Sequence, residues 1–141
     1  PDCDMLAFGI SAIGKVGASY VANVKTLDEY YQRLDANELP VMRGVELDAD
    51  DLLRRNVIQK LMCNFELDFA AVGAEFGIPF AEYFAPDLAA LQPLAADGLV
   101  ALDARSVRVT PRGRLLVRTV AMQFDRYLRE AQAKAQYSKV I

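Results

Sequence analysis

One continuous stretch, Asp68 to Arg118, constrains the fold of this chain more than any other. Its apolar spacing and turn residues predict a short helix, a turn, a second helix, a two-stranded hairpin and the start of a long helix. Asp68 is suited to cap the first helix and Gly77 to end it. Period-two alternation over residues 99–103 and 106–110 predicts the hairpin. This order is typical of a winged helix-turn-helix module.

The charges of this stretch argue against nucleic-acid binding. From Leu61 to Ala104 there is no Lys or Arg, whereas the same interval holds seven acids. Neutralising a phosphate backbone requires cations, and the net charge of −3 provides no general attraction to polyanions. We therefore interpret the module as a packing or lid domain with no nucleic-acid partner. A winged-helix regulator and a protein-interaction module are the alternatives.

The arginines of the chain are concentrated in two places. Five of them fall within 14 residues after the acidic stretch, at Arg105, Arg108, Arg112, Arg114 and Arg118. We interpret them as partners of the protein's own acids, with a site for a polycarboxylate or nucleic acid as the alternative. Arg54 and Arg55 lie on a helix that Asp48 is suited to cap, and we expect them on its solvated face, with a binding role as the alternative.

The composition excludes most catalytic and metal sites. The chain has no histidine, which removes the commonest general base and most zinc sites. Cys3 and Cys63 are 60 residues apart, a spacing that matches no metal or redox motif. We therefore predict no catalytic residue and no metal ligand in these 141 positions. No apolar run approaches the ~20 residues that span a bilayer, so no membrane partner is expected.

The N-terminal segment predicts a strand, a loop and a helix. Residues 4–13, DMLAFGISAI, form a continuous apolar run typical of a strand buried on both faces of a parallel sheet. Glycines follow as a loop, and a capping box from Thr26 to Glu29 opens a helix. Residues 37–44 are expected to be a linker. A single strand has no sheet to join, so we expect its partners in sequence outside this chain.

Several segments, in the same order, resemble one enzyme family. They are GISAI, LRRNVIQKLMCNFELDF, YFAPDLAALQPLAADGLV, VTPRGRLLVR, FDRYL and the terminal YSKVI. The chain resembles the C-terminal third of the oxygen-independent coproporphyrinogen III oxidases (coproporphyrinogen dehydrogenases), radical S-adenosylmethionine enzymes of haem biosynthesis. Related haem chaperones are the alternative within the superfamily, although they usually lack the full C-terminal region.

The resemblance implies a mainly α fold in two parts. Residues 1–44 would be a strand-loop-helix from the edge of a partial TIM barrel, and residues 45–141 a winged-helix-like lid domain with a β-hairpin wing. The rest of the barrel, outside this chain, would be the partner of both parts. It would carry the C-x3-C-x2-C triad that binds a [4Fe-4S] cluster, and Cys3 and Cys63 cannot supply that triad.

The resemblance also implies the reaction and its cofactors. The cluster would cleave S-adenosylmethionine, and the resulting radical would remove hydrogen from propionates of coproporphyrinogen III. Two oxidative decarboxylations would give the vinyl groups of protoporphyrinogen IX. The implied enzyme is a cytoplasmic oxidoreductase, and this fragment alone is predicted to be inactive. Radical chemistry requires exclusion of solvent, which is the purpose of a covering domain.

One cofactor contact follows from the resemblance. In the family, the GxSAI segment supplies an isoleucine that touches a second S-adenosylmethionine, and that residue matches Ile13. An isoleucine offers an apolar surface without a charge or a proton, so its role would be packing. Ile13 is therefore the candidate cofactor-binding residue, and the alternative is that it is ordinary core.

Overall fold

The computed structural model describes the backbone of residues 3–137 and the side-chain environment of residues 3–131. It divides into two compact units, Pro1–Leu52 and Leu53–Ile141. Within the described residues it contains seven α-helices and two small three-stranded sheets. None of the helices in this part of the chain is long and apolar enough to cross a membrane.

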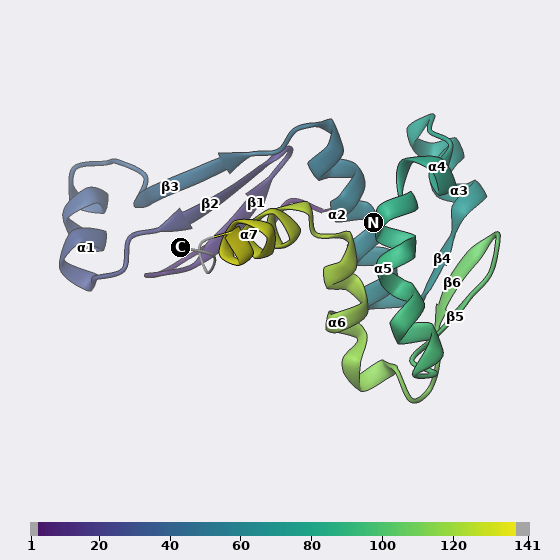
Figure 1. Cartoon of the computed structure of the whole chain (residues 1–141). Helices are drawn as coiled ribbons and strands as arrows, with labels where there is room; N and C mark the ends of the chain where they lie inside the picture. The colour runs from purple at the N-terminus through teal and green to yellow at the C-terminus, as the bar shows by residue number, and fades with distance from the viewer. Residues whose placement is uncertain (1–2, 138–141) are drawn as a thin grey trace. The chain divides into compact units, whose positions relative to one another are not determined.

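The first unit is built on an antiparallel sheet with the strand order β1-β2-β3 (Figure 1). Its strands are β1 (Ile13–Val16), β2 (Ser19–Asn23) and β3 (Val41–Glu46), and helix α1 (Leu27–Asp35) connects the last two. Gly17, at φ +54°, turns the chain back so that β1 pairs with β2. The left-handed conformation favours glycine at such a tight reversal.

The predicted buried strand over residues 4–13 is wrong, and so is the expectation that its partners lie outside the chain. The strand begins at Ile13, where the prediction ended it, and its neighbour is β2. Upstream, a single bridge joins Met5 to Lys15, while Leu6 and Phe8 are 70% and 83% exposed. The continuous apolar run over residues 4–13 therefore forms an exposed apolar surface and not a strand buried on both faces.

Helix α1 begins where the capping box predicts, since the Thr26 side chain accepts a hydrogen bond from the Glu29 N–H at 3.4 Å. The predicted linker over residues 37–44 is wrong because β3 begins inside it, at Val41. Asn37 adopts a left-handed φ of 59° and provides the turn. The breaker residues therefore mark a short connection between α1 and β3, not a domain linker.

The second unit begins within α2 (Ala49–Asn64), which crosses the boundary between the units. Strand β4 (Glu66–Asp68) and helices α3 (Phe69–Phe76), α4 (Phe80–Tyr83) and α5 (Ala85–Ala96) follow. The hairpin strands β5 (Val100–Leu102) and β6 (Ser106–Val109) complete a sheet of order β4-β6-β5 (Figure 1). The sequence did not predict β4, which has only three residues.

Local signals set the ends of these helices. Asp48 and Asp68 cap α2 and α3, accepting hydrogen bonds from the N–H groups of Asp51 at 2.8 Å and Ala71 at 2.7 Å. Gly77 ends α3 at φ +67°. After α5, Gly98 and Leu99 donate backbone hydrogen bonds to Ala95 and Leu94, the pattern of a Schellman motif. The ends predicted at Asp48, Asp68 and Gly77 are confirmed, and α5 runs through Pro93 to Ala96.

The single long helix predicted after the hairpin is wrong. The chain forms η1 (Arg114–Leu116), α6 (Val117–Ala121) and η2 (Met122–Phe124), breaks at Asp125, and continues as α7 (Arg126–Tyr137). Asp125 is extended, with φ −85° and ψ 105°. The break changes the helix phase beyond it, so Tyr127 is 55% exposed, whereas Val120 and Phe124 before the break are fully buried. Residues 138–141 of the quoted YSKVI segment lie outside the described residues.

The apolar core is unevenly divided between the two units. Among residues 3–131, seventeen hydrophobic side chains are buried, and Val24 alone of these precedes Leu53. The other sixteen include Val57, Leu61, Val107 and Phe124, each at 0% exposure. The second unit therefore contains nearly all of the buried apolar surface that drives folding.

Among the glycines of the second unit, Gly113 leaves the least space for an added Cβ atom. A Cβ at this position would lie 2.0 Å from the Leu99 carbonyl oxygen, which is backbone and cannot rotate away. We expect Gly113→Ala to lower the free energy of unfolding by at least about 2 kcal/mol in urea titrations, because backbone must move. Gly44→Ala is the control, since its nearest contact is at 3.4 Å. Equal small effects from the two variants would contradict this packing.

Candidate functional site

Ile13, the predicted cofactor contact, lies at the first position of β1 and is 60% exposed. The strand register places Ile13 opposite Ala22, and Ala22 opposite Arg43, so the three residues share one face of the sheet. This cross-strand row consists of the apolar Ile13, the small Ala22 and the exposed cation of Arg43. In the described residues the Ile13 side chain is accessible to a ligand.

The loop before Ile13 is held by a buried asparagine that sequence reasoning missed. Asn23, 4% exposed, donates from Nδ2 to the Gly9 carbonyl at 2.9 Å and to the Ala7 carbonyl at 3.3 Å. Ser11 has a left-handed φ of 56°, and its N–H donates to the Val24 carbonyl at 2.8 Å. These bonds fix the approach of the chain to Ile13. An isolated asparagine carries no sequence signal that would reveal this.

The described residues do not provide an iron-sulfur site. Cys3 and Cys63 are free and exposed. Within the described part of the chain, no group of three or more His, Cys, Asp or Glu side chains could hold a metal ion. These residues therefore do not fit the donor set of a [4Fe-4S] cluster.

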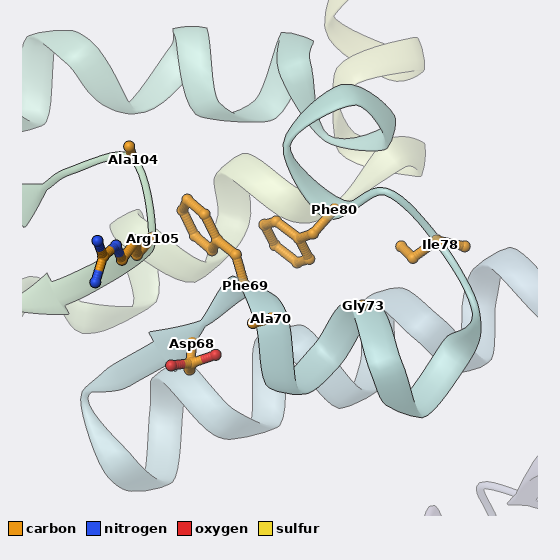
Figure 2. A pocket seen from close by; sticks show the side chains of 8 residues that line it. All are labelled: Asp68, Phe69, Ala70, Gly73, Ile78, Phe80, Ala104 and Arg105. Atoms are coloured by element: carbon orange, nitrogen blue, oxygen red, sulfur yellow. The ribbon is translucent and has the colours of Figure 1, made fainter.

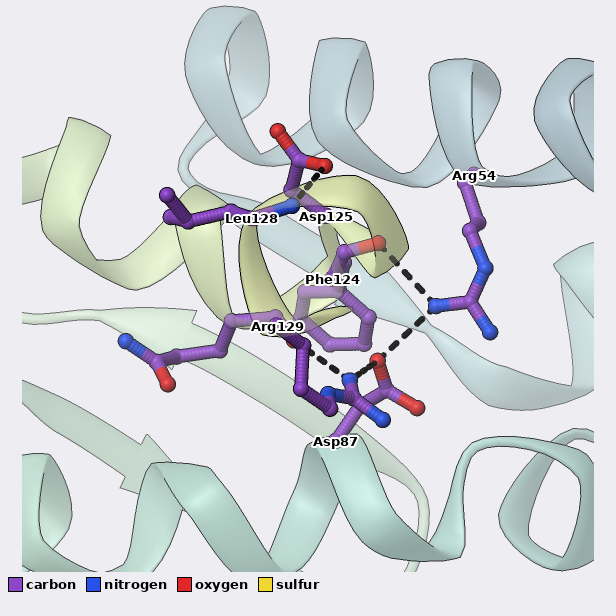
Figure 3. A network of polar contacts seen from close by, with 7 residues as sticks. Arg54, Asp87, Phe124, Asp125, Leu128 and Arg129 are labelled. Carbon is purple, nitrogen blue, oxygen red and sulfur yellow. Dashed lines mark hydrogen bonds and ion pairs between the residues drawn. The ribbon is translucent and has the colours of Figure 1, made fainter. Parts of the chain in front are cut away.

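The second unit contains a buried carboxylate between two arginines (Figure 3). Asp87 of α5 is 1% exposed, and its Oδ1 accepts hydrogen bonds from Arg54 of α2 at 2.9 Å and from Arg129 of α7. The two arginines also donate at 3.0 Å to the carbonyls of Phe124 and Gln123. One carboxylate therefore connects three helices with the segment that precedes the break at Asp125.

The expectation that Arg54 lies on a solvated face is wrong. Its side chain is 13% exposed and lies 5.2 Å from the Phe84 ring centroid, over the ring. Arg54 and Asp87 are 33 residues apart, so helical periodicity could not indicate the pairing. A buried charge requires a partner, and the acid supplies it.

Two of the five arginines near the hairpin, Arg108 and Arg114, make side-chain contacts within the second unit. Arg108 bonds Glu66 across the sheet at 2.8 Å, which confirms matched charges at this position and raises the pKa of Arg108. Arg114 lies 5.0 Å from the Phe65 ring centroid. At the hairpin tip, the Arg105 N–H donates to Asp103 and lowers the pKa of that carboxyl group. These contacts account for the charges of Arg108 and Arg114 without an external polyanion.

A cavity of about 410 Å³ lies beside this hairpin, between the start of α3 and the turn before α4 (Figure 2). The stacked rings of Phe69 and Phe80, with centroids 4.6 Å apart, are part of its lining. Both side chains are nearly fully buried, at 6% and 4% exposure. The cavity lining includes one acidic residue, Asp68, and one basic residue, Arg105, and the Asp68 carboxylate already caps α3.

Known proteins with similar sequences support a family assignment. Residues 47–116 match the family model described as HemN C-terminal domain. The oxygen-independent coproporphyrinogen III oxidases of Salmonella typhimurium and Escherichia coli are 49% and 46% identical over 140 residues, 99% of this chain. The chain belongs to the HemN family.

A solved HemN structure agrees with this assignment. The structure described as "Coproporphyrinogen III oxidase (HemN) from Escherichia coli is a Radical SAM enzyme" aligns with 89% of this chain at a TM-score of 0.84 and 46% identity. The chain spans 31% of the length of the two curated relatives and 29% of the solved HemN chain. It therefore corresponds to about a third of a longer HemN protein.

The buried ion pairs predict an unequal response to mutation. Asp87→Ala removes the buried carboxylate that Arg54 and Arg129 share, so we expect a loss of about 3–5 kcal/mol in the free energy of unfolding. Arg129→Ala is the matched comparison. Its side chain is 42% exposed, and solvent screening limits the expected loss to about 1 kcal/mol. The free energy of unfolding of both variants is measured by urea titration. Equal losses would contradict the burial of Asp87 and the partial exposure of Arg129.

Proposed function

We propose that this chain is the C-terminal part of an oxygen-independent coproporphyrinogen III oxidase. The proposed enzyme removes two propionate carboxyl groups of coproporphyrinogen III by oxidative decarboxylation and gives protoporphyrinogen IX in the cytoplasm. The observation that carries the proposal is the collinear identity of 46–49% across 99% of the chain with relatives of that name. S-adenosylmethionine and a [4Fe-4S] cluster supply the radical chemistry, and the cluster is bound outside this chain.

We further propose the domain arrangement predicted above. Residues 1–44, together with the remainder of β3 up to Glu46, belong to a radical-SAM barrel domain, and the residues that follow form a winged-helix-like lid that covers the active site. The element order from α2 to β6 and the sheet order β4-β6-β5 support the winged-helix label. The absence of cations from Leu61 to Ala104 favours a covering role over DNA binding.

Ile13 is the residue proposed to touch the second S-adenosylmethionine. Its accessible side chain and its fixed upstream loop support the contact. Ile13 is the first residue of β1, and its exposed apolar side chain lies on the row that it shares with Ala22 and Arg43.

Full-length protein tests the activity and the contact together. The reconstituted protein is expected to convert coproporphyrinogen III under anaerobic conditions with S-adenosylmethionine and a reductant. Ile13→Ala removes apolar contact area, so we expect apparent S-adenosylmethionine affinity to weaken by about 1–3 kcal/mol while cluster absorbance remains unchanged. Turnover measured against S-adenosylmethionine concentration gives this value.

Val16→Ala provides the control on the same strand. Val16 is 45% exposed and, three positions from Ile13, lies on the opposite face of the sheet. Its variant should keep the wild-type dependence on S-adenosylmethionine. Identical behaviour of the two variants would remove the Ile13 assignment, whereas a cluster-loaded wild-type protein without turnover would contradict the oxidase itself.

A further inference from the structure

The first unit exposes an apolar helix stripe that nothing in the described structure covers. Leu27, Tyr31 and Leu34 lie at i, i+4 and i+7 on α1, a spacing that places them on one helix face. They are 57%, 58% and 43% exposed, and α1 contains no buried residue. An amphipathic helix usually buries such a face. We refer to these three residues as the α1 stripe.

The polar side of α1 has its own partners. Arg33 bonds Glu29 at 2.9 Å and donates to the Val41 carbonyl at 2.8 Å. Tyr30, beside the stripe, accepts a hydrogen bond from the Gly9 N–H at 3.0 Å. These bonds hold α1 within its unit, while the α1 stripe remains without a charged side chain. Its chemistry therefore suits an apolar partner surface.

We propose that the α1 stripe docks against the N-terminal part of the full-length protein. This inference rests on the proposed domain arrangement and names the surface that makes the contact. HemN relatives are about three times as long as this chain, which spans 31% of them. The first unit, with Val24 as its one buried hydrophobic side chain among residues 3–52, lacks a core that would stabilise it alone.

The size of the α1 stripe favours a partner in the same chain. Three partly exposed side chains offer far less than the about 800 Å² per partner that a stable interface between separate proteins buries. A covalently linked partner is held at high effective concentration, so a small apolar contact is sufficient. A second copy of this chain would need additional surface and is the alternative occupant.

Cysteine accessibility in the full-length protein tests the docking. Tyr31→Cys and Leu34→Cys place a thiol on the α1 stripe, and Gln32→Cys places one on the exposed opposite side of the same helix. Maleimide labelling rates, normalised to those of the denatured protein, are compared at the three positions by peptide mass. We expect the stripe thiols to react at least about tenfold more slowly than the Gln32→Cys thiol, because reaction requires local opening.

Each outcome decides for or against the docking. Equal rates at the three positions would overturn it. Protection that disappears when the protein is diluted to a monomer would identify a second copy as the occupant and also overturn it. Turnover of coproporphyrinogen III by the wild-type protein is measured on the same preparation. Protection without turnover would refute the oxidase proposal alone, and turnover without protection would refute the docking alone.

Discussion

The shared apolar core of the second unit is the constraint on which the rest of this structure depends. Leu61, Leu91 and Phe124, from α2, α5 and η2, are each fully buried within it. Asp87 lies at 1% exposure among these elements, and its charge is tolerated there because Arg54 and Arg129 converge on it. The core and its ion pairs together hold the helices that carry the hairpin.

Sequence reasoning succeeded where the signals were local. Thr26, Asp48, Asp68 and Gly77 set helix ends through contacts within a few residues, and each was predicted. It failed where pairing partners decide the structure. The apolar run before Ile13 has the composition of a buried strand, yet Gly17 and the register of β2 make it the approach to a hairpin. The Arg54–Asp87 pair spans 33 residues, beyond any periodic pattern.

The candidate site shows the same division. Ile13 could be named only through the family resemblance, because an exposed isoleucine has no chemical signature of its own. Asn23, which fixes the loop before it, and Arg43, which shares its face, emerge only from the strand register and the hydrogen bonds. In the proposed enzyme these residues would position and shield a cofactor, and the radical chemistry would belong to groups bound elsewhere.

Hydrogen exchange of the 141-residue chain, measured as a monomer, tests most directly the claim that the second unit holds the core. Amides in the interior of α2, α5 and β6 should exchange only through global unfolding of that unit. Amides of β1, β2 and β3 should exchange at least about a hundredfold faster, because few buried apolar contacts oppose their local opening. Equal protection of the two sets in the monomer would contradict the account.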